Sequence, residues 1–393
     1  MSTEDQVNSH FLRFLEAVFI SHAWATEFAR RRSGFGGFAK LKWKCSSRIN
    51  LQIATVTQMR VVIFGGTGFV GAHYARHLLD ERSDVQVVLC DRNPLDHDRF
   101  APALLNALKS DRLAYCEVDL RQRIPDHVAH GGVDLIVNFA AIHREPGHEA
   151  WEYFETNLLG AENVCKFAEE SGCQTLLFSS SISPYGPSDK ARDERSLPVP
   201  ATPYGASKLA AEKIHLAWQR GGIGRKLLIV RPGVVFGPGE GGNVTRMIKF
   251  VRKGLFVYLG NQEVRKAGVF VKELCRMCDW GLERLSDPEF CNIHPGAAFF
   301  NASFSKPPSV EDYVKAIKEV GGYTRPTFSI PFKLIYFASF FFMGLGGIHP
   351  VRMKKLIRPN LILPTFLSEL KYPWKWSLEE ALADWKAEYP QDW

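Results

Sequence analysis

Tyr204 and Lys208 are the two residues whose types and spacing most clearly indicate chemistry, because they lie four residues apart in "PYGASK". On a helix this spacing places both side chains on one face. A neighbouring ammonium stabilises a phenolate and lowers the pKa of the tyrosine, which favours a role as general acid/base. The helical apolar spacing of "LAAEKIHLAW", directly after Lys208, predicts the helix that this pairing requires.

A second tyrosine, Tyr185 in "SISPYGPS", shares the tripeptide Pro-Tyr-Gly but not this arrangement. Asp189 follows it by four residues and carries a charge of the wrong sign, while Pro187 disfavours a helix. We therefore predict that Tyr185 is a turn or pocket residue.

Two polar residues are expected near the Tyr-Lys pair. Ser181 follows the apolar run "LLFS", and we expect its hydroxyl to lie beside Tyr204 and to hold the reacting oxygen. Asn157 lies in the helical stretch "ETNLLGAENV", although asparagine forms helices poorly. Asn157 is therefore either a site residue or a solvent-facing asparagine.

The stretch "VVIFGGTGFVGAHYARHLL" is typical of a strand, a glycine-rich turn and a helix. Gly65, Gly68 and Gly71 give the spacing G-x-x-G-x-x-G of dinucleotide-binding turns, in which the backbone approaches a pyrophosphate at a helix N-terminus. Asp91 follows twenty residues after Gly71, at the end of the second predicted strand, and a carboxylate there favours NAD over NADP. Arg92 leaves the alternative open, because an arginine can pair with the 2′-phosphate of NADP.

Asp119, after the third predicted strand, is positioned to meet the adenine edge. The alternative is that it caps the N-terminus of a helix, and the two roles are compatible.

The surrounding pattern predicts an α/β fold of the Rossmann type, a doubly wound parallel sheet with helices on both faces. The strands are mostly continuous apolar runs, as expected for strands buried on both faces, at 61–64, 85–90, 113–118, 135–140, 175–179 and 227–231. We predict an NAD-binding domain over 59–232 and a smaller substrate-binding part over 233–393, with a segment returning to the sheet near 268–295.

Composition excludes several classes of function. The chain has 393 residues, a formal net charge of +7, and 46% hydrophobic and 23% charged residues. Residues 2–58 hold eight Lys/Arg against four Asp/Glu, so the remainder is nearly neutral and does not indicate a nucleic-acid partner. Eight cysteines without dense spacing, and no signal-peptide pattern, indicate a reducing cytoplasm. The CxxC of Cys275 and Cys278 lacks a second pair, so we predict core cysteines and no metal site.

Two segments stand outside this pattern. Residues 1–58 are basic, Gly-rich and aromatic, and are either a targeting or membrane-surface arm, or a disordered or non-native extension before Met59. Residues 331–358 combine an apolar run, 334–348, with four following cations. This run is too short to span a bilayer, so it either rests on an anionic membrane face or is a buried helix.

The motifs "GGTGFVG", "NFAA", "FSSS", "PYGASK" and "RPGVVFGPG", in this order, resemble the extended short-chain dehydrogenase/reductases, in particular the NAD-dependent sugar epimerase/dehydratase family, over about 59–293. The resemblance implies a catalytic tetrad of Asn157, Ser181, Tyr204 and Lys208. It also implies that Tyr204 takes a proton from a sugar hydroxyl, that Lys208 holds the nicotinamide ribose, and that Asn157 supports a relay water. The residues expected to line the NAD site are Gly65, Gly68, Phe69, Val70, Gly71, Asp91, Arg92, Asp119, Leu120, Ala140, Ala141, Tyr204, Lys208 and Arg231.

The resemblance also limits the reaction. Dehydratases of the family carry an added acid just after the serine, whereas residues 182–184 here are Ile-Ser-Pro. What remains is reversible oxidation with NAD retained, as in sugar 4-epimerases acting on nucleotide-linked or polyprenyl-diphosphate-linked sugars, with His143, Ser181, Asn243 and Arg246 as expected substrate ligands. A dehydrogenase of the 3β-hydroxysteroid type and a cofactor-sensing protein without catalysis are the alternatives. Family members are commonly homodimers.

Overall fold

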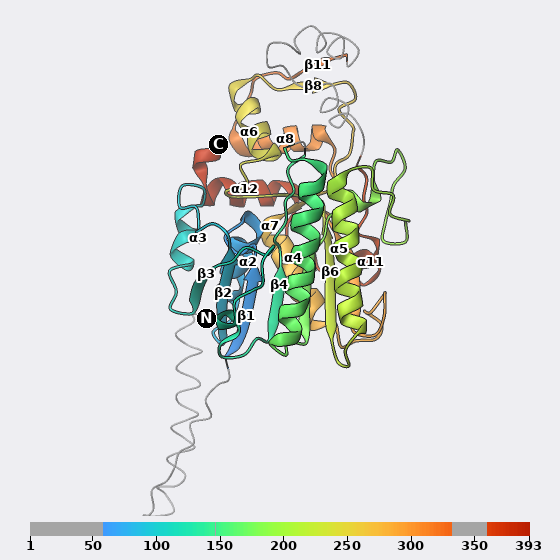
Figure 1. Ribbon diagram of the computed structural model, residues 1–393. Coiled ribbons are helices and arrows are strands. Elements are labelled where there is room, and N and C mark those ends of the chain that lie inside the picture. Colours follow the sequence, from blue (N-terminus) through green and yellow to red (C-terminus); the bar gives the residue numbers. More distant parts are fainter. Residues whose placement is uncertain (1–57, 146, 332–359) are drawn as a thin grey trace, which may run out of the picture. The chain divides into compact units, whose positions relative to one another are not determined.

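The structure, a computed structural model, describes residues 58–145, 147–331 and 360–393. Its centre is a seven-stranded sheet in the order β10-β6-β5-β4-β1-β2-β3, in which all neighbouring strands run parallel (Figure 1). The strands are β1 (Met59–Phe64), β2 (Val85–Asp91), β3 (Leu113–Glu117), β4 (Leu135–Asn138), β5 (Thr175–Ser179), β6 (Lys226–Pro232) and β10 (Ala297–Ala302). The predicted Rossmann-type parallel sheet is confirmed.

The burial of each strand follows from its position in the sheet. The four residues Val61 to Phe64 of β1 are fully buried, as expected for a central strand covered on both faces. Strand β3 lies at the edge, and its Tyr115 is 40% exposed. The six strands predicted from continuous apolar runs are therefore all present, within two residues at either end.

Helices cover both faces of the sheet. On one face, α2 (Phe69–Glu81) and α7 (Val271–Glu283) bury Leu78 and Met277 in the same core as the sheet residue Leu89. On the other face, α4 (Ala150–Glu170) and α5 (Pro203–Arg220) lie side by side and pack Phe167 and Trp218 in a core with the sheet (Figure 1). The remaining helix beside the sheet edge is α3 (Pro102–Ala107).

The C-terminal part has a core of its own above the sheet (Figure 1). Phe236, Ile248, Phe270, Ile317 and Trp385 are all fully buried in it. Its elements are β7 (Val234–Phe236), α6 (Asn243–Lys253), β8 (Val257–Leu259), β9 (Gly268–Phe270), α8 (Val310–Gly321), β11 (Phe328–Ile330) and α12 (Leu378–Glu388). Helix α11 (Thr365–Glu369) instead packs Leu367 in the core of the sheet, beside β10.

The sheet extends beyond the predicted boundary at residue 232. The returning strand is β10, which begins just after the predicted range 268–295, and that range instead holds β9 and α7. A parallel strand can be reached only through a crossover connection, and α7 supplies that connection to β10. Within α7, Cys275 and Cys278 are buried free thiols, which confirms their prediction as core residues.

Two sequence expectations lie outside the described residues: the extension 1–58, of which only Gln58 is described, and the element 331–358, of which only Pro331 is described. Of the helices in the described ranges, none has both the length and the apolar character needed to cross a membrane.

Candidate active site

The predicted site residues gather at the carboxyl edge of the sheet. Strand β1 pairs with β2 on one side and with β4 on the other, so the order of the strands reverses there. Parallel sheets bind ligands in the crevice outside the strand ends at such a reversal. The loops that follow β1, β4 and β5 all begin at this edge and carry the predicted cofactor and catalytic residues.

The glycine turn after β1 is packed too closely for side chains. Gly65 has φ +73°, and a Cβ on it would lie 2.6 Å from the backbone nitrogen of Ala140. A Cβ on Gly71 would lie 2.2 Å from the carbonyl oxygen of Gly65. The N–H groups of Gly65 and Gly66 both donate to the carbonyl of Cys90, which fixes the turn against β2. These contacts leave the backbone itself as the surface that a ligand meets.

Helix α2 begins at Phe69, directly after this turn. Its N-cap is Gly68, which provides no side-chain cap, and its first turn holds no acidic residue. The amide groups of Phe69, Val70 and Gly71 therefore have no side-chain anion to bind, and the positive end of the helix dipole favours a phosphate there. The residues present fit the pyrophosphate of a dinucleotide.

Asp91 is the last residue of β2 and is half-buried at the same edge. Arg92 beside it is exposed and lies close enough to Asp119 to lower the pKa of that carboxyl group. The larger cause of this lowered pKa is the hydrogen bond from Arg121, whose Nη2 lies 2.6 Å from Asp119 Oδ2. No helix begins at Asp119 in the described structure, so the predicted helix-capping alternative is wrong.

Leu120, the next residue, is 9% exposed, and its side chain packs in the core beneath α4. Its carbonyl oxygen accepts a hydrogen bond of 2.7 Å from Asn163 Nδ2. Its part in cofactor binding stays a prediction, and its observed role is to fix the loop after β3 against α4.

Tyr204 lies in the first turn of α5. The hydroxyl oxygen of Thr202, the N-cap, accepts a hydrogen bond of 3.1 Å from the N–H of Gly205, and Pro203 occupies the first helical position that proline favours. A Cβ on Gly205 would lie only 2.7 Å from the carbonyl oxygen of Ser183. The helix therefore begins in close contact with the serine loop after β5, which brings Tyr204 to Ser181.

Ser181 is 8% exposed, and its side chain lies close enough to the hydroxyl of Tyr204 to lower the pKa of that group. Its Oγ also accepts a hydrogen bond of 3.1 Å from the N–H of Ser183. The serine is thus held by its own loop while facing the tyrosine, as predicted from the sequence.

The pKa values of the pair differ from the sequence expectation. The pKa of Tyr204 is raised to about 12, mainly by desolvation, with the charges of Glu145 and Tyr153 adding to the rise and Ser181 opposing it. Desolvation also lowers the pKa of Lys208 to about 7, against the opposing charge of Glu212. The expectation that Lys208 lowers the pKa of Tyr204 is therefore wrong for the chain alone, because burial disfavours the charged form of both groups.

Lys208 is 2% exposed, and its Nζ lies 4.5 Å from the centre of the Phe178 ring. It follows Tyr204 on the same helix and lies deeper in the molecule. A buried amine with a pKa near neutral pH can change its protonation state when a charged ligand binds.

Asn157 is 6% exposed, so the alternative of a solvent-facing asparagine is wrong. Its Oδ1 accepts from the N–H of Ile142 at 3.0 Å, and its Nδ2 donates to the carbonyl of Ile142 at 3.3 Å and to Ser207 Oγ at 2.9 Å. One carboxamide thus joins the loop after β4, helix α4 and helix α5.

The predicted substrate residues are placed differently from one another. His143 follows β4. Desolvation lowers its pKa, and so do the charges of Arg144, Lys208 and Arg99, which places His143 near Lys208. Asn243 and Arg246 are both exposed on α6, where Arg246 Nη2 donates to Asn243 Oδ1 at 2.7 Å.

Arg231 does not reach the cofactor edge with its side chain. The guanidinium is 7% exposed and forms an ion pair of 2.6 Å with Glu212 beneath α5. Its assignment to the cofactor site is corrected, because the guanidinium is fully engaged by a core carboxylate.

Sequence reasoning missed three residues of the site. Gly205 permits the contact between α5 and the serine loop, and Glu145 raises the pKa of Tyr204. The ring of Tyr153 lies 6.2 Å from that of Tyr204, and its hydroxyl donates to the carbonyl of Arg144. Tyr153 precedes Asn157 by four residues on α4, and this spacing could have identified it as a neighbour.

A glycine turn that fits a dinucleotide, beside a tyrosine that lies close to a serine and is followed by a buried lysine, defines a Rossmann-fold enzyme of the reductase type. The family model described as the NAD dependent epimerase/dehydratase family matches residues 61–293. The chain belongs to this family, which confirms the predicted resemblance and the predicted use of NAD.

The similar proteins named below are all sugar 4-epimerases. The chain is 24% identical over 307 residues to the N-acetyl-alpha-D-glucosaminyl-diphospho-ditrans,octacis-undecaprenol 4-epimerase of Escherichia coli O157:H7, covering 75% of this chain and 84% of the relative. It is 24% identical over 287 residues to the UDP-glucose 4-epimerase of Bacillus subtilis, covering 68% and 84%. The solved UDP-glucuronic acid 4-epimerase of Bacillus cereus in complex with NAD shares the fold with a TM-score of 0.65 at 18% identity, covering 85% and 99%.

Proposed function

We propose that this chain is an NAD-dependent 4-epimerase of a sugar carried on a nucleotide diphosphate or a polyprenyl diphosphate. The observation that carries the proposal is the close contact between the first turn of α5, which holds Tyr204, and the loop of Ser181, at the edge that also holds the glycine turn. A tyrosine placed in this way can exchange a proton with a secondary hydroxyl. The relatives named above support the sugar as the substrate class.

Each protein residue has a part in the proposed mechanism. Ser181 holds the sugar hydroxyl at C4 beside Tyr204. The phenolate form of Tyr204, which the positive charges of Lys208 and of a bound nicotinamide would favour, takes the hydroxyl proton on oxidation and returns it on reduction. The glycine turn would hold NAD, which would supply a reversible hydride acceptor for C4. The keto sugar turns within the site between the two steps, so that its other face is reduced and the C4 configuration inverts.

The residues after Ser181 argue against dehydration. Ser183 bonds within the loop, and Tyr185 is fully buried with its hydroxyl donating to Asn301 Oδ1 at 3.0 Å. Neither can serve as the additional acid that elimination of a hydroxyl requires. Oxidation and re-reduction without loss of water is the reaction that this loop supports.

We propose that α6 binds the diphosphate of the carrier. The carboxylate of Glu240 already accepts hydrogen bonds from the N–H groups of Val244 and Thr245, at 3.4 and 2.9 Å, so the helix N-terminus itself is occupied. Arg246 and Asn243 are the exposed polar groups in the first turn of α6, and the guanidinium can exchange its bond to Asn243 for two phosphate oxygens. Arg246→Ala should raise KM for the sugar diphosphate with little change in kcat.

The proposed reaction is tested with purified chain, NAD and a panel of UDP-, GDP- and polyprenyl-diphosphate-linked sugars. Products are identified by NMR, and NADH is followed by absorbance. The proposal expects interconversion of C4 epimers without net NADH, and loss of turnover with retained NAD binding in Tyr204→Phe. Steady accumulation of NADH with an alcohol substrate, including a 3β-hydroxysteroid, would instead establish the dehydrogenase alternative.

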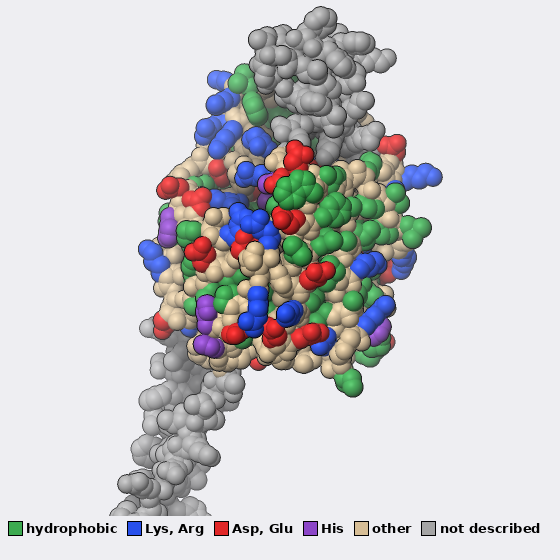
Figure 2. Space-filling view, in the orientation of Figure 1, with side chains coloured by type: hydrophobic (Ala, Val, Ile, Leu, Met, Phe, Trp, Pro, Cys, Tyr) green, Lys and Arg blue, Asp and Glu red, His purple; other side chains and the backbone are tan. Residues whose placement is uncertain are grey.

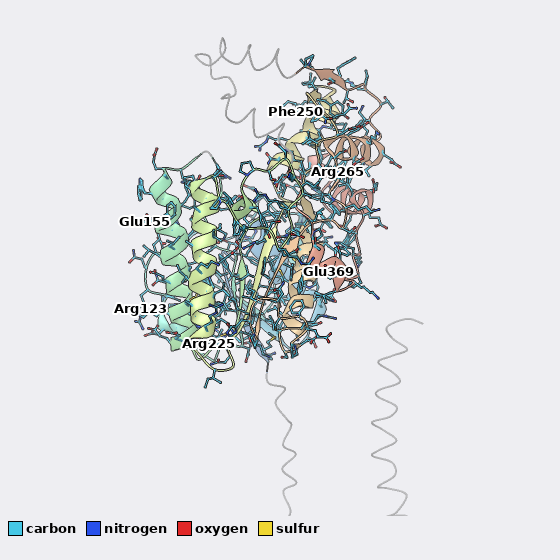
Figure 3. All side chains as sticks on the ribbon, turned by 90° about the vertical axis from the view of Figure 1, so that its right-hand side faces the viewer. Arg123, Glu155, Arg225, Phe250, Arg265 and Glu369 are labelled. Carbon is cyan, nitrogen blue, oxygen red and sulfur yellow. The ribbon has the colours of Figure 1, made fainter. Side chains whose placement is uncertain are left out.

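We also propose a peripheral contact with the cytoplasmic face of a membrane through residues 331–358. Among the described residues, Phe250, Leu255 and Phe328 are 49%, 63% and 65% exposed, and Figure 3 labels Phe250 on α6. Helix α6 adds Arg246, Lys249, Arg252 and Lys253, a combination that suits an anionic bilayer surface. The chain should sediment with vesicles containing phosphatidylglycerol but not with phosphatidylcholine alone.

A homodimer through α4 is the last element of the proposal. Trp151, Phe154 and Leu159 on this helix are 62%, 38% and 41% exposed, and Figure 2 shows hydrophobic side chains gathered over α4 and α5. Light scattering should give twice the chain mass, and Leu159→Glu should give one chain mass.

A further inference from the structure

A buried ion pair lies beneath the catalytic helix. Arg231 on β6 donates from Nε to Glu212 Oε1 at 2.8 Å and from Nη2 to Oε2 at 2.6 Å. Ser180 Oγ donates to the same Oε1 at 2.5 Å. The side chains of Arg231 and Glu212 are 7% and 3% exposed. Both oxygens of the carboxylate are therefore bound within the core.

Glu212 also follows Lys208 by four residues on α5, at the spacing at which lysine and glutamate pair on a helix. Such pairs form elsewhere in this chain, at 2.8 Å between Lys315 and Glu311 and at 3.9 Å between Lys166 and Glu170. Among the ion pairs of the described residues, Glu212 pairs with Arg231 and not with Lys208.

Arg231 is held firmly in this position. Its guanidinium carbon lies 4.9 Å from the centre of the Tyr185 ring and 4.6 Å from that of Phe299. The hydroxyl of Tyr185 is fixed in turn by Asn301. Burial lowers the pKa of Arg231, but the hydrogen bonds and charge of Glu212 outweigh burial and raise it, so the guanidinium stays charged.

We propose that Arg231 is a positioning residue for the proposed reaction: it occupies the carboxylate of Glu212 and so prevents Lys208 from pairing one turn down its own helix. The amine then remains available to the hydride-transfer site. Tyr185, the tyrosine without a lysine partner, contributes by supporting the guanidinium.

The groups that face Lys208 allow this idea to be tested by titration. They are Glu212 and His215 from α5, His143 from the loop after β4, and the Phe178 ring from β5. Desolvation lowers the pKa of His215 to about 4, so it is neutral near pH 7. Glu212 is thus the one anion that raises the pKa of Lys208, and Arg231 offsets it from β6.

The experiment follows the Lys208 amine by NMR in full-length, nucleotide-free protein labelled with 13C-lysine, with Lys208→Arg identifying the resonance. Arg231→Met should raise the titration midpoint of Lys208 by about one pH unit or more, equivalent to tenfold in proton affinity. Glu212→Gln should lower it, because the charge of Arg231 is then unopposed. The double variant should return it to within about half a unit of the wild-type midpoint.

Two further variants keep the test decisive. Arg231→Lys retains the positive charge and should leave the midpoint near that of the wild type, even if Arg231→Met folds poorly. Arg225→Met removes an arginine whose side chain is 15% exposed and pairs with Glu169 at 3.0 Å, and it should leave the titration midpoint of Lys208 unchanged. A wild-type midpoint in Arg231→Met, or shifts of the same sign in both single variants, would overturn the proposal. The inference rests on the proposed function, but the titration needs no turnover. Its result can therefore be distinguished from a failure of the proposed epimerase activity.

Discussion

Gly205 approaches the carbonyl oxygen of Ser183 so closely that a Cβ on it would lie 2.7 Å from that oxygen. This contact sets the first turn of α5, which holds Tyr204, against the serine loop, which holds Ser181. The placement of the predicted catalytic residues therefore depends on Gly205, which has no reactive side chain.

Gly205→Ala should push the first turn of α5 away from the serine loop and abolish most of the turnover. We expect kcat to fall by about 100-fold or more, because small displacements of reacting groups cost that much, and the free energy of unfolding to fall by about 1–3 kcal/mol from overpacking. Gly160→Ala on α4 is the matched control, since its Cβ would meet Leu120 Cβ at an ordinary 3.5 Å. Equal turnover in the two variants would contradict this role of Gly205.

Gly71→Ala should weaken NAD binding. Its Cβ would lie 2.2 Å from the carbonyl oxygen of Gly65, so the glycine turn must open to accommodate it. We expect the Kd for NAD, measured by calorimetry, to rise by about 100-fold, as for the loss of several charge-assisted bonds to phosphate. An unchanged Kd would place the pyrophosphate elsewhere.

The stability of the nucleotide-free chain should depend on pH through Lys208. Desolvation lowers the pKa of this amine from 10.5 to about 7 in the folded state. Between these values the unfolded chain binds a proton that the folded chain does not, so stability rises with pH across this window. Lys208→Met removes the dependence.

The free energy of unfolding in urea should therefore be higher for Lys208→Met than for the wild type, and this difference should be largest below pH 7 and shrink toward pH 10. A difference that stays constant over this range would show that Lys208 is not desolvated as described.

Asn157→Ala should lower both stability and turnover. It removes the carboxamide that bonds Ile142 and Ser207, at a cost of about 1–3 kcal/mol for buried groups left unpaired. Asn292→Ala is a useful comparison, because that carboxamide likewise bonds both the N–H and the carbonyl of Phe299. Asn292→Ala should retain full kcat, and a similar loss of kcat in both variants would reduce Asn157 to a purely structural role.

Much of this arrangement could be predicted from the sequence because its signals are local. The glycine spacing before α2 and the Tyr-Lys spacing on α5 each lie within one element, and buried parallel strands are continuous apolar runs. Ser181 was expected beside Tyr204 because it follows the apolar run of a predicted strand.

Features that depend on distant residues could not be predicted. Arg231 was expected among the residues that line the NAD site, but its partner Glu212 lies 19 residues earlier on α5. The pKa of Tyr204 was expected to fall because charge spacing is visible in a sequence, whereas desolvation depends on packing. Gly205 was overlooked because its reason, the carbonyl of Ser183, is a tertiary contact.

The central claim is that hydride leaves C4 and returns to C4 within one closed site, while Tyr204 carries only the proton. The most direct measurement is the fate of deuterium placed at C4 of a sugar substrate that the chain converts in ordinary water. The account predicts that the epimeric product retains the deuterium at C4, with no exchange into solvent. Loss of deuterium to water, or its accumulation in free NADH beside an oxidised sugar, would contradict the account.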